Sequence, residues 1–169
     1  MSGPIGSPWL DGAVTAAAVG SAVIGGVLFG FSSFIMSALD RLPPDRSIEA
    51  MQSINRQAPT AAFGSVMFGT AAVAVVVGVA GARRLDTGAG RMLILGAVSY
   101  LAAVVITGVF HVPRNDRLAT VVTPAADTAR TWSDYAGPWT AGNHLRAALA
   151  ILAAVLFTVA GQFYGGSNT

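Results

Sequence analysis

The sequence predicts an all-α integral membrane protein: an antiparallel four-helix transmembrane bundle with a short interfacial helix in the first loop and a structured third loop. Of the 169 residues, 53% are hydrophobic and only 11% are charged. The mean hydropathy is +0.61, which no ordinary water-soluble domain reaches. Apolar stretches over 13–39, 61–82, 92–110 and 145–163 are each about as long as a membrane-spanning helix. Residues 1–169 are therefore expected to form a single membrane domain.

The first stretch, 13–39, is uncharged and longer than the roughly 20 residues that cross a bilayer. Two adjacent rows of small residues run along it: Ala22, Gly26 and Gly30, and beside them Ser21 and Gly25. Small residues let helix backbones approach closely where no hydrophobic effect drives association. We therefore expect this helix to pack inside the bundle.

The segment 40–60 is polar, and within it Ile48, Met51 and Ile54 recur at threefold spacing. This pattern predicts a short amphipathic helix lying in the membrane interface. Its polar residues are expected to face water or lipid headgroups: Glu49, Gln52 and Arg56. Asn55 is a candidate to line a cavity, although a solvated surface is the commoner place for a lone polar residue of this kind.

The remaining connections set the topology. The turn 83–91 is short and basic, so the second and third spans must form an antiparallel hairpin. The longest loop is expected over 111–142, and four spans place both termini on one side. The arginine count favours the first and third loops on the cytoplasmic side of a plasma membrane.

Composition excludes several kinds of chemistry. The chain has no cysteine, so disulfides, iron–sulfur clusters and thiolate zinc sites are excluded. All ten basic residues are arginines, which excludes a lysine base or Schiff base. Two histidines and a single glutamate cannot form a His-rich di-iron site. The arginines are scattered at helix ends, where they act as topology signals and headgroup anchors, so no nucleic-acid partner is expected.

Aromatic and polar residues gather at the start of the last span. Trp132, Tyr135, Trp139, Asn143 and Arg146 fall at offsets of three, seven, eleven and fourteen. They share one helix face if Gly137-Pro138 only bends the helix. An aromatic belt at the interface is one interpretation, with the arginine reaching lipid phosphates. A functional site is the other, because strongly polar residues at a span entrance are costly unless they are paired or used.

A second polar cluster follows the third span. Pro113 ends or bends that helix, and Asn115 and Asp116 can cap whatever comes next. Asp116 is also the carboxylate nearest in topology to His111 and His144, which are expected at the same depth. Three chemistries stay open: an Asp116–His144 acid–base pair, a two-His-one-carboxylate iron site, or bis-His haem. Both metal alternatives need His111, and no further ligand is evident.

Motifs over nearly the whole chain follow one order and spacing: Phe34–Met36, Leu39–Pro43, Ala50–Arg56, Val112–Pro113, Asn115–Ala119, then Trp132, Tyr135, Trp139 and Asn143–Arg146. Together they resemble the DUF1772 family of small four-helix membrane proteins, which includes the anthrone oxygenases. Two positions depart from the family pattern. His111 stands where the family usually has Asn, which argues against an obligatory ligand role. Gly142 replaces a usual aromatic residue, which predicts a reshaped pocket.

The resemblance implies a membrane-bound, cofactor-independent monooxygenase that converts an anthrone-like polyketide to a quinone, with O2 as co-substrate and no metal. An anthrone anion can pass an electron to oxygen directly, so the protein need only bind, deprotonate and exclude water. His144, oriented by Asp116, is expected to be the base. The enolate oxygen is expected to accept hydrogen bonds from Asn115, Asn143 and Arg146. The flat substrate is expected to bind Trp132, Tyr135, Trp139 and Asn55.

Two functions from other classes remain open. One is a non-catalytic accessory subunit, in which the small-residue faces of the first helix dock a partner. The other is a haem or iron protein, which would be coloured after purification. The expected partners are the lipid bilayer and a hydrophobic aromatic small molecule, and the sequence also leaves a homo-oligomer open.

Overall fold

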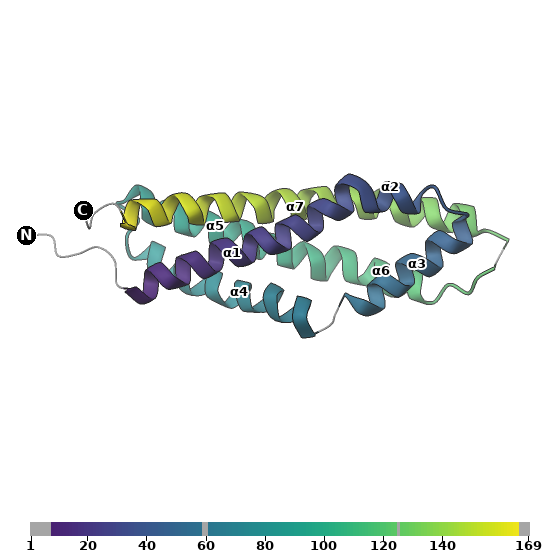
Figure 1. The fold of residues 1–169 in the computed structure, drawn as a ribbon, viewed down its shortest axis with the longest axis horizontal. Coiled ribbons are helices and arrows are strands. Elements are labelled where there is room, and N and C mark those ends of the chain that lie inside the picture. The colour runs from purple at the N-terminus through teal and green to yellow at the C-terminus, as the bar shows by residue number, and fades with distance from the viewer. Residues whose placement is uncertain (1–7, 59–60, 125, 166–169) are drawn as a thin grey trace, which may run out of the picture.

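The computed structural model describes residues 8–58, 61–124 and 126–165, and this part of the chain is helical without strands. Four long helices run antiparallel along one axis, and α1 begins at the same end of the bundle where α7 finishes (Figure 1). The elements are α1 (Pro8–Gly30), the π-helical turn η1 (Phe31–Ile35), α2 (Met36–Leu39), α3 (Pro44–Gln57), α4 (Ala61–Ala82), α5 (Gly88–Ile106), the π-helical turn η2 (Thr107–His111), α6 (Val112–Ala119) and α7 (Thr128–Gly165).

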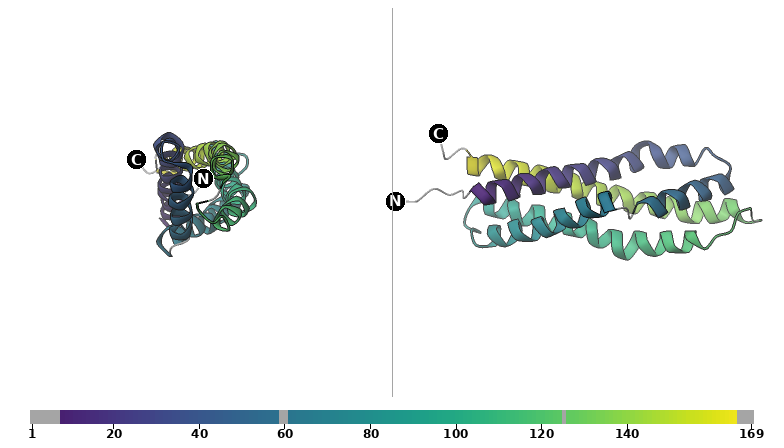
Figure 2. Two further views of the ribbon diagram at one scale, coloured as in Figure 1. Left: turned by 90° about the vertical axis from the view of Figure 1, so that its right-hand side faces the viewer. Right: turned by 60° about the horizontal axis from the view of Figure 1, so that its bottom comes forward.

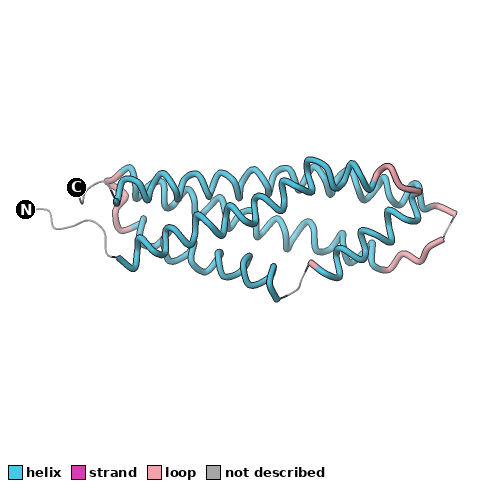
Figure 3. Tube along the Cα trace, in the orientation of Figure 1, coloured by secondary structure: helices cyan, strands magenta, loops and turns pink. Residues whose placement is uncertain are grey.

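Four of these helical runs are long and apolar enough to cross a membrane: Pro8–Leu39, Ala62–Ala82, Gly88–Ala119 and Thr128–Phe163. The predicted four-helix membrane bundle is therefore confirmed. Seen end on, the long helices pack side by side as a bundle, and the short α3 extends this bundle at one end (Figure 2). Most described loops lie at the two ends of the bundle, and the turn that ends α3 lies partway along it (Figure 3).

The third loop is much shorter than the sequence predicted. The third long helix continues through Pro113 to Ala119, and α7 already begins at Thr128. Pro113 lies directly after η2, at the start of α6 within this continuous helix. Pro138 lies inside α7 on an exposed stretch, where water can bond the carbonyl that loses its partner. Neither proline ends its helix. The aromatic residues before Pro138 therefore lie on the same helix, α7, as Arg146.

Helix α3 is present, and its apolar face packs on protein. Ile48 and Met51 are fully buried. They belong to a second hydrophobic cluster with Leu118, Trp132 and Trp139, separate from the main core between the long helices. The apolar face of α3 therefore packs against α6 and α7.

Gln52 differs from the prediction that it faces water. Its amide Nε2 donates to the carbonyl oxygens of Leu118 and Val121, at 2.8 and 2.9 Å. This side chain ties α3 to the end of α6, whereas Arg56 is exposed as expected. Glu49 is half-buried and accepts hydrogen bonds from Arg46 and Thr123.

The close packing of the first helix uses the second small-residue row. Ser21 and Gly25 are buried, and a Cβ added at Gly25 would lie 2.9 Å from a side-chain carbon of Ile151 on α7. Ala22 and Gly26 face outward, and nothing lies within 4 Å of a Cβ added at Gly26. The first helix therefore packs inside the bundle as predicted, and it does so through the row of Ser21 and Gly25.

Candidate functional site

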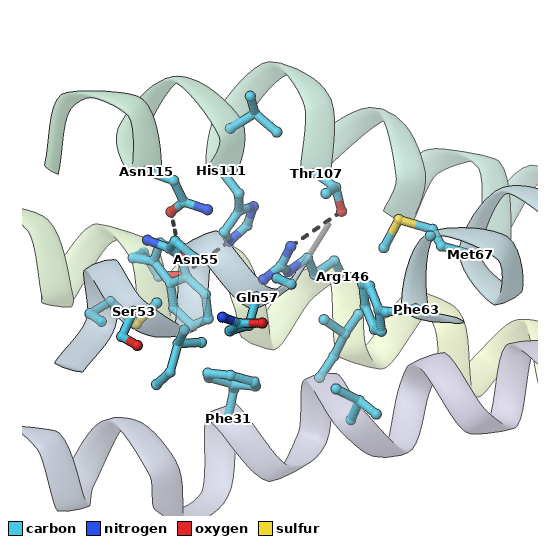
Figure 4. A pocket seen from close by; sticks show the side chains of 18 of the residues that line it. Phe31, Ser53, Asn55, Gln57, Phe63, Met67, Thr107, His111, Asn115 and Arg146 are labelled. Atoms are coloured by element: carbon cyan, nitrogen blue, oxygen red, sulfur yellow. Dashed lines mark hydrogen bonds between the residues drawn. The ribbon is translucent and has the colours of Figure 1, made fainter. Parts of the chain in front are cut away.

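A cavity of about 530 Å³ lies at the α3 end of the bundle, bounded by α1, η1, α3, α4, η2, α6 and α7 (Figure 4). Most of its lining is apolar, including Phe31, Met51, Phe63, Met67 and Trp139. Among the polar residues that line it are Asn55, Thr107, His111, Asn115 and Arg146. Small-molecule sites have this character: mostly apolar walls with a few placed polar groups.

Both π-helical turns border this cavity. Phe31 opens η1, while Thr107 and His111 are the first and last residues of η2. A π turn inserts one extra residue into a helix, and such turns occur frequently at functional sites. The wider turn of η2 brings Thr107 and His111 to the same cavity. Sequence periodicity contains no signal for either turn.

The predicted face of α7 is confirmed, because Trp132, Tyr135, Trp139, Asn143 and Arg146 are all buried. Only Trp139 and Arg146 reach the cavity. Trp132 instead donates its indole N–H to Asp40 Oδ1 at 2.7 Å, which ties α7 to the end of α2. The aromatic residues are therefore a protein-facing stripe and not an interface belt.

Asn115 is held by two donors from this stripe. Its Oδ1 accepts hydrogen bonds from the Tyr135 hydroxyl at 2.8 Å and from the Trp139 indole N–H at 3.0 Å. Asn55 Nδ2 donates to the Tyr135 hydroxyl at 3.3 Å. Because both donors use the amide oxygen, the orientation of the Asn115 side chain is fixed, and its NH2 group remains a donor for the cavity that Asn115 lines.

Arg146 is 6% exposed and its guanidinium lines the cavity. Its Nε donates to Asn143 Oδ1 at 2.8 Å, and one terminal nitrogen donates to the Thr107 hydroxyl at 3.3 Å (Figure 4). Asn143 does not line the cavity; its own Nδ2 donates to the Leu28 carbonyl and the Ser32 hydroxyl, both at 2.7 Å. Asn143 therefore positions Arg146, whose side chain points inward and not toward lipid phosphates.

His111, for which the family pattern argued against an obligatory ligand role, is 1% exposed and lines the cavity. Its Nδ1 lies 3.3 Å from the Ile106 carbonyl oxygen, and its Nε2 lies 3.2 Å from the Trp139 carbonyl oxygen. The imidazole also meets the Trp139 ring edge-on, with centroids 5.2 Å apart. The ring is thus fixed in orientation at the centre of the polar part of the site.

Gly142 makes room for this histidine. A Cβ added at Gly142 would lie 3.0 Å from Cε1 of His111 and 2.5 Å from Cε1 of Phe110. The two departures from the family pattern therefore touch each other, since a side chain at position 142 would displace the imidazole. Treating these departures as a pair is the one sequence signal that could have revealed His111.

His144 and Asp116 lie outside the cavity. Both are exposed, and no hydrogen bond or ion pair joins them in the described structure. Each follows a residue that faces inward, Asn143 and Asn115, and one step along a helix turns a side chain by about 100°. Asn115 and Asp116 also lie within α6, so they cap no new helix. The expected Asp116–His144 pair is therefore not formed.

The metal alternatives lack a ligand set in the described part of the chain. There, no group of three or more His, Cys, Asp or Glu side chains lies close enough to hold a metal ion. His111 is buried and His144 is exposed, so the two rings do not face a common axial position for haem.

The fold and the cavity define a small helical membrane protein with an aromatic-lined site that is partly open to the outside. The protein-family model for anthrone oxygenases matches residues 51–156. The chain therefore belongs to the anthrone oxygenase family. This match covers more than half of the chain and includes His111, Asn115, Trp139 and Arg146. Membership indicates an oxygenase-like role. No curated protein and no solved structure matches the chain.

Proposed function

We propose that this protein is a cofactor-independent membrane oxygenase that oxidises an anthrone-like polyaromatic compound to a quinone with O2. The observation that carries the proposal is the cavity of about 530 Å³, walled by Phe31, Phe63 and Trp139 and containing one imidazole, His111. Its volume falls in the usual range for small-molecule sites, about 300–1,000 Å³. The family match supports the oxygenase class of reaction.

The reaction requires a base and a hydrogen-bond donor that stabilises the enolate oxygen. An anthrone has an acidic methylene, because the anion left by proton removal is an enolate conjugated with both outer rings. The anion gives one electron to O2, and the resulting radical and superoxide combine into a peroxide at that carbon. The second C–H proton then leaves as the O–O bond breaks, which forms the quinone carbonyl. One oxygen atom of O2 ends in the product and the other in water.

His111 takes the place that the sequence analysis gave to His144. Its ring lines the cavity with a carbonyl oxygen near each nitrogen, from Ile106 and Trp139. A neutral imidazole can donate to only one of them, whereas the imidazolium formed on proton transfer donates to both. To act as the base, the ring nitrogen that carries no proton must exchange its carbonyl contact for the C–H of the substrate, while the other nitrogen keeps its hydrogen bond and holds the ring.

The other cavity residues bind and orient the substrate. Trp139 and Phe31, with ring centroids 5.6 Å apart, provide apolar walls for flat rings. Asn115 presents a fixed amide donor to the carbonyl oxygen that becomes the enolate oxygen. Tyr135 supports this donor from behind, and Trp132 lies against Tyr135 with centroids 5.9 Å apart. We place the cavity end of the bundle on the cytoplasmic side, following the arginine distribution.

The test is oxygen uptake by the detergent-purified protein with anthrone as substrate and a metal chelator present. We expect one O2 consumed per quinone formed, at a rate well above spontaneous oxidation and unaffected by the chelator. A rate equal to spontaneous oxidation would contradict the proposal and favour the accessory-subunit alternative. Loss of turnover in chelator, restored by a metal, would contradict its cofactor-free chemistry.

A further inference from the structure

The Arg146 guanidinium is a buried charge without a counter-ion in the described chain. The ion pairs there join Arg46 to Glu49 and Arg130 to Asp134, and neither involves Arg146. Its own partners are the neutral side chains of Asn143 and Thr107. Charged residues inside membrane helices are costly, and they almost always pair with each other or mark a ligand pathway.

The guanidinium retains unused hydrogen-bonding capacity. An arginine has five N–H donors in a planar fork. Two of them serve the hydrogen bonds to Asn143 and Thr107, which leaves three for the cavity that Arg146 lines. The Thr107 hydroxyl donates to the Ala103 carbonyl at 2.9 Å, so its lone pairs are directed at Arg146. The surrounding groups thus fix the cation but do not neutralise it.

Aromatic rings surround the same position. The guanidinium carbon lies 5.1 Å from the centroid of the Trp139 ring, and Phe31 and Phe63 line the cavity beside it. Figure 4 shows Asn115 and Arg146 on either side of His111. The Asn115 amide and the Arg146 guanidinium can therefore bind different parts of one ligand. A planar fork above an aromatic wall suits a carboxylate or ionised phenol carried on flat rings.

We propose that Arg146 binds a permanent anionic group of the substrate, so that the cavity selects aromatic acids over their neutral counterparts. This inference rests on the proposed function, because it names the substrate class of the same cavity. It assigns Arg146 to substrate recognition and leaves the enolate oxygen to Asn115. Asn143 is a positioning residue that holds the fork through Nε.

The experiment measures equilibrium binding of two isosteric probes, anthraquinone-2-carboxylate and anthraquinone-2-carboxamide, to the full-length protein in non-ionic detergent at pH 8. The wild type is expected to bind the carboxylate about tenfold more tightly than the carboxamide, because the carboxylate forms an ion pair with a buried guanidinium. In Arg146→Met the preference falls to about threefold or less, because the carboxylate loses more affinity than the carboxamide does.

Arg114→Met is the matched control. This arginine lies near the same site, with its guanidinium 3.5 Å from the Phe110 ring centroid and a hydrogen bond to the Phe110 carbonyl, but it does not line the cavity. It is expected to keep the wild-type preference. Thr107→Val, which removes one partner of the fork, serves as a second variant with an intermediate preference and covers the case in which Arg146→Met does not fold.

Equal affinity of the wild type for the two probes would overturn the proposal, as would a preference that survives Arg146→Met. Dodecyl phosphate tests for a lipid headgroup: binding as tight as that of the anthraquinone carboxylate, and lost in Arg146→Met, would assign the site to lipid and overturn the aromatic-acid proposal. Both probes are already quinones and need no turnover. Failure here is therefore distinct from failure of oxygen uptake, which tests the reaction.

Discussion

The α4–α5 hairpin and the cavity end of the bundle differ in what lies between their helices. In the hairpin, backbones nearly touch: a Cβ added at Gly81 would lie 2.6 Å from the Gly90 carbonyl oxygen, and one at Gly78 would lie 2.8 Å from Cβ of Ala97. At the cavity end the helices part around about 530 Å³ of space, and π turns replace α turns.

The two regions also differ in their buried polar groups. At the cavity end, His111, Asn143 and Arg146 are all buried, and their hydrogen bonds join α1, η1, η2 and α7. In the hairpin, Thr87 caps α5 by accepting from the Gly90 N–H at 3.0 Å, and the contacts beyond it are largely apolar. The comparison teaches that close packing in one part of a small bundle can support, in another part, a mostly apolar cavity with a few buried polar groups.

The largest stability effect is expected where the hairpin is tightest. Gly81→Val should destabilise the protein by about 1–3 kcal/mol, because the added carbons meet the backbone of Gly90 and the side chain of Leu93. Gly69→Val on the same helix is the control, since nothing lies within 4 Å of a Cβ there. Thermal unfolding in detergent measures both. Equal thermal unfolding midpoints for Gly81→Val and Gly69→Val would contradict the close packing of the hairpin.

Filling the cavity should affect activity and leave stability unchanged. Gly64 lines the cavity, and nothing lies within 4 Å of a Cβ added there. Gly64→Phe is therefore expected to lower kcat/KM for anthrone by about tenfold, while Gly69→Phe, outside the cavity, keeps it. Steady-state oxygen uptake measures this effect. If Gly69→Phe loses as much activity as Gly64→Phe, the cavity is not the site of reaction.

A smaller stability effect is expected at the tie between α3 and the end of α6. Gln52→Ala removes two hydrogen bonds, to the Leu118 and Val121 carbonyls, and should cost about 1 kcal/mol. Arg56→Ala, on an exposed position of the same helix, should change the unfolding free energy very little. An Arg56→Ala effect as large as that of Gln52→Ala would show that α3 is held in some other way.

The smallest effect is a pH dependence at the same end. Hydrogen bonds from Thr123 and then Arg46 lower the pKa of Glu49 below its usual 4.5. A lowered folded-state pKa means that this contribution is present above the unfolded pKa and is lost as pH falls through the folded value. Thr123→Val should therefore reduce the loss of stability on acidification below pH 4.5. An unchanged acid profile would indicate that this hydrogen bond is not maintained in solution.

The sequence predicted the bundle and one face of α7, because apolar length and helical offsets are local properties. Trp139 and Arg146 were placed together by their spacing alone. His144 was paired with Asp116 in the sequence analysis although both side chains are exposed, because loop topology predicts depth in the membrane but not direction around a helix. The π turn that orients His111, and the space that Gly142 leaves for it, depend on tertiary contacts.

The most direct test compares the two histidines in one assay. Initial rates of anthrone-dependent oxygen uptake are measured for wild type, His111→Gln and His144→Gln, with a chelator present and folding checked by circular dichroism. Removal of a general base typically costs about 100-fold or more, so His111→Gln should approach the spontaneous rate while His144→Gln turns over like wild type. Full activity in His111→Gln, with loss in His144→Gln, would contradict the placement of the reaction in this cavity.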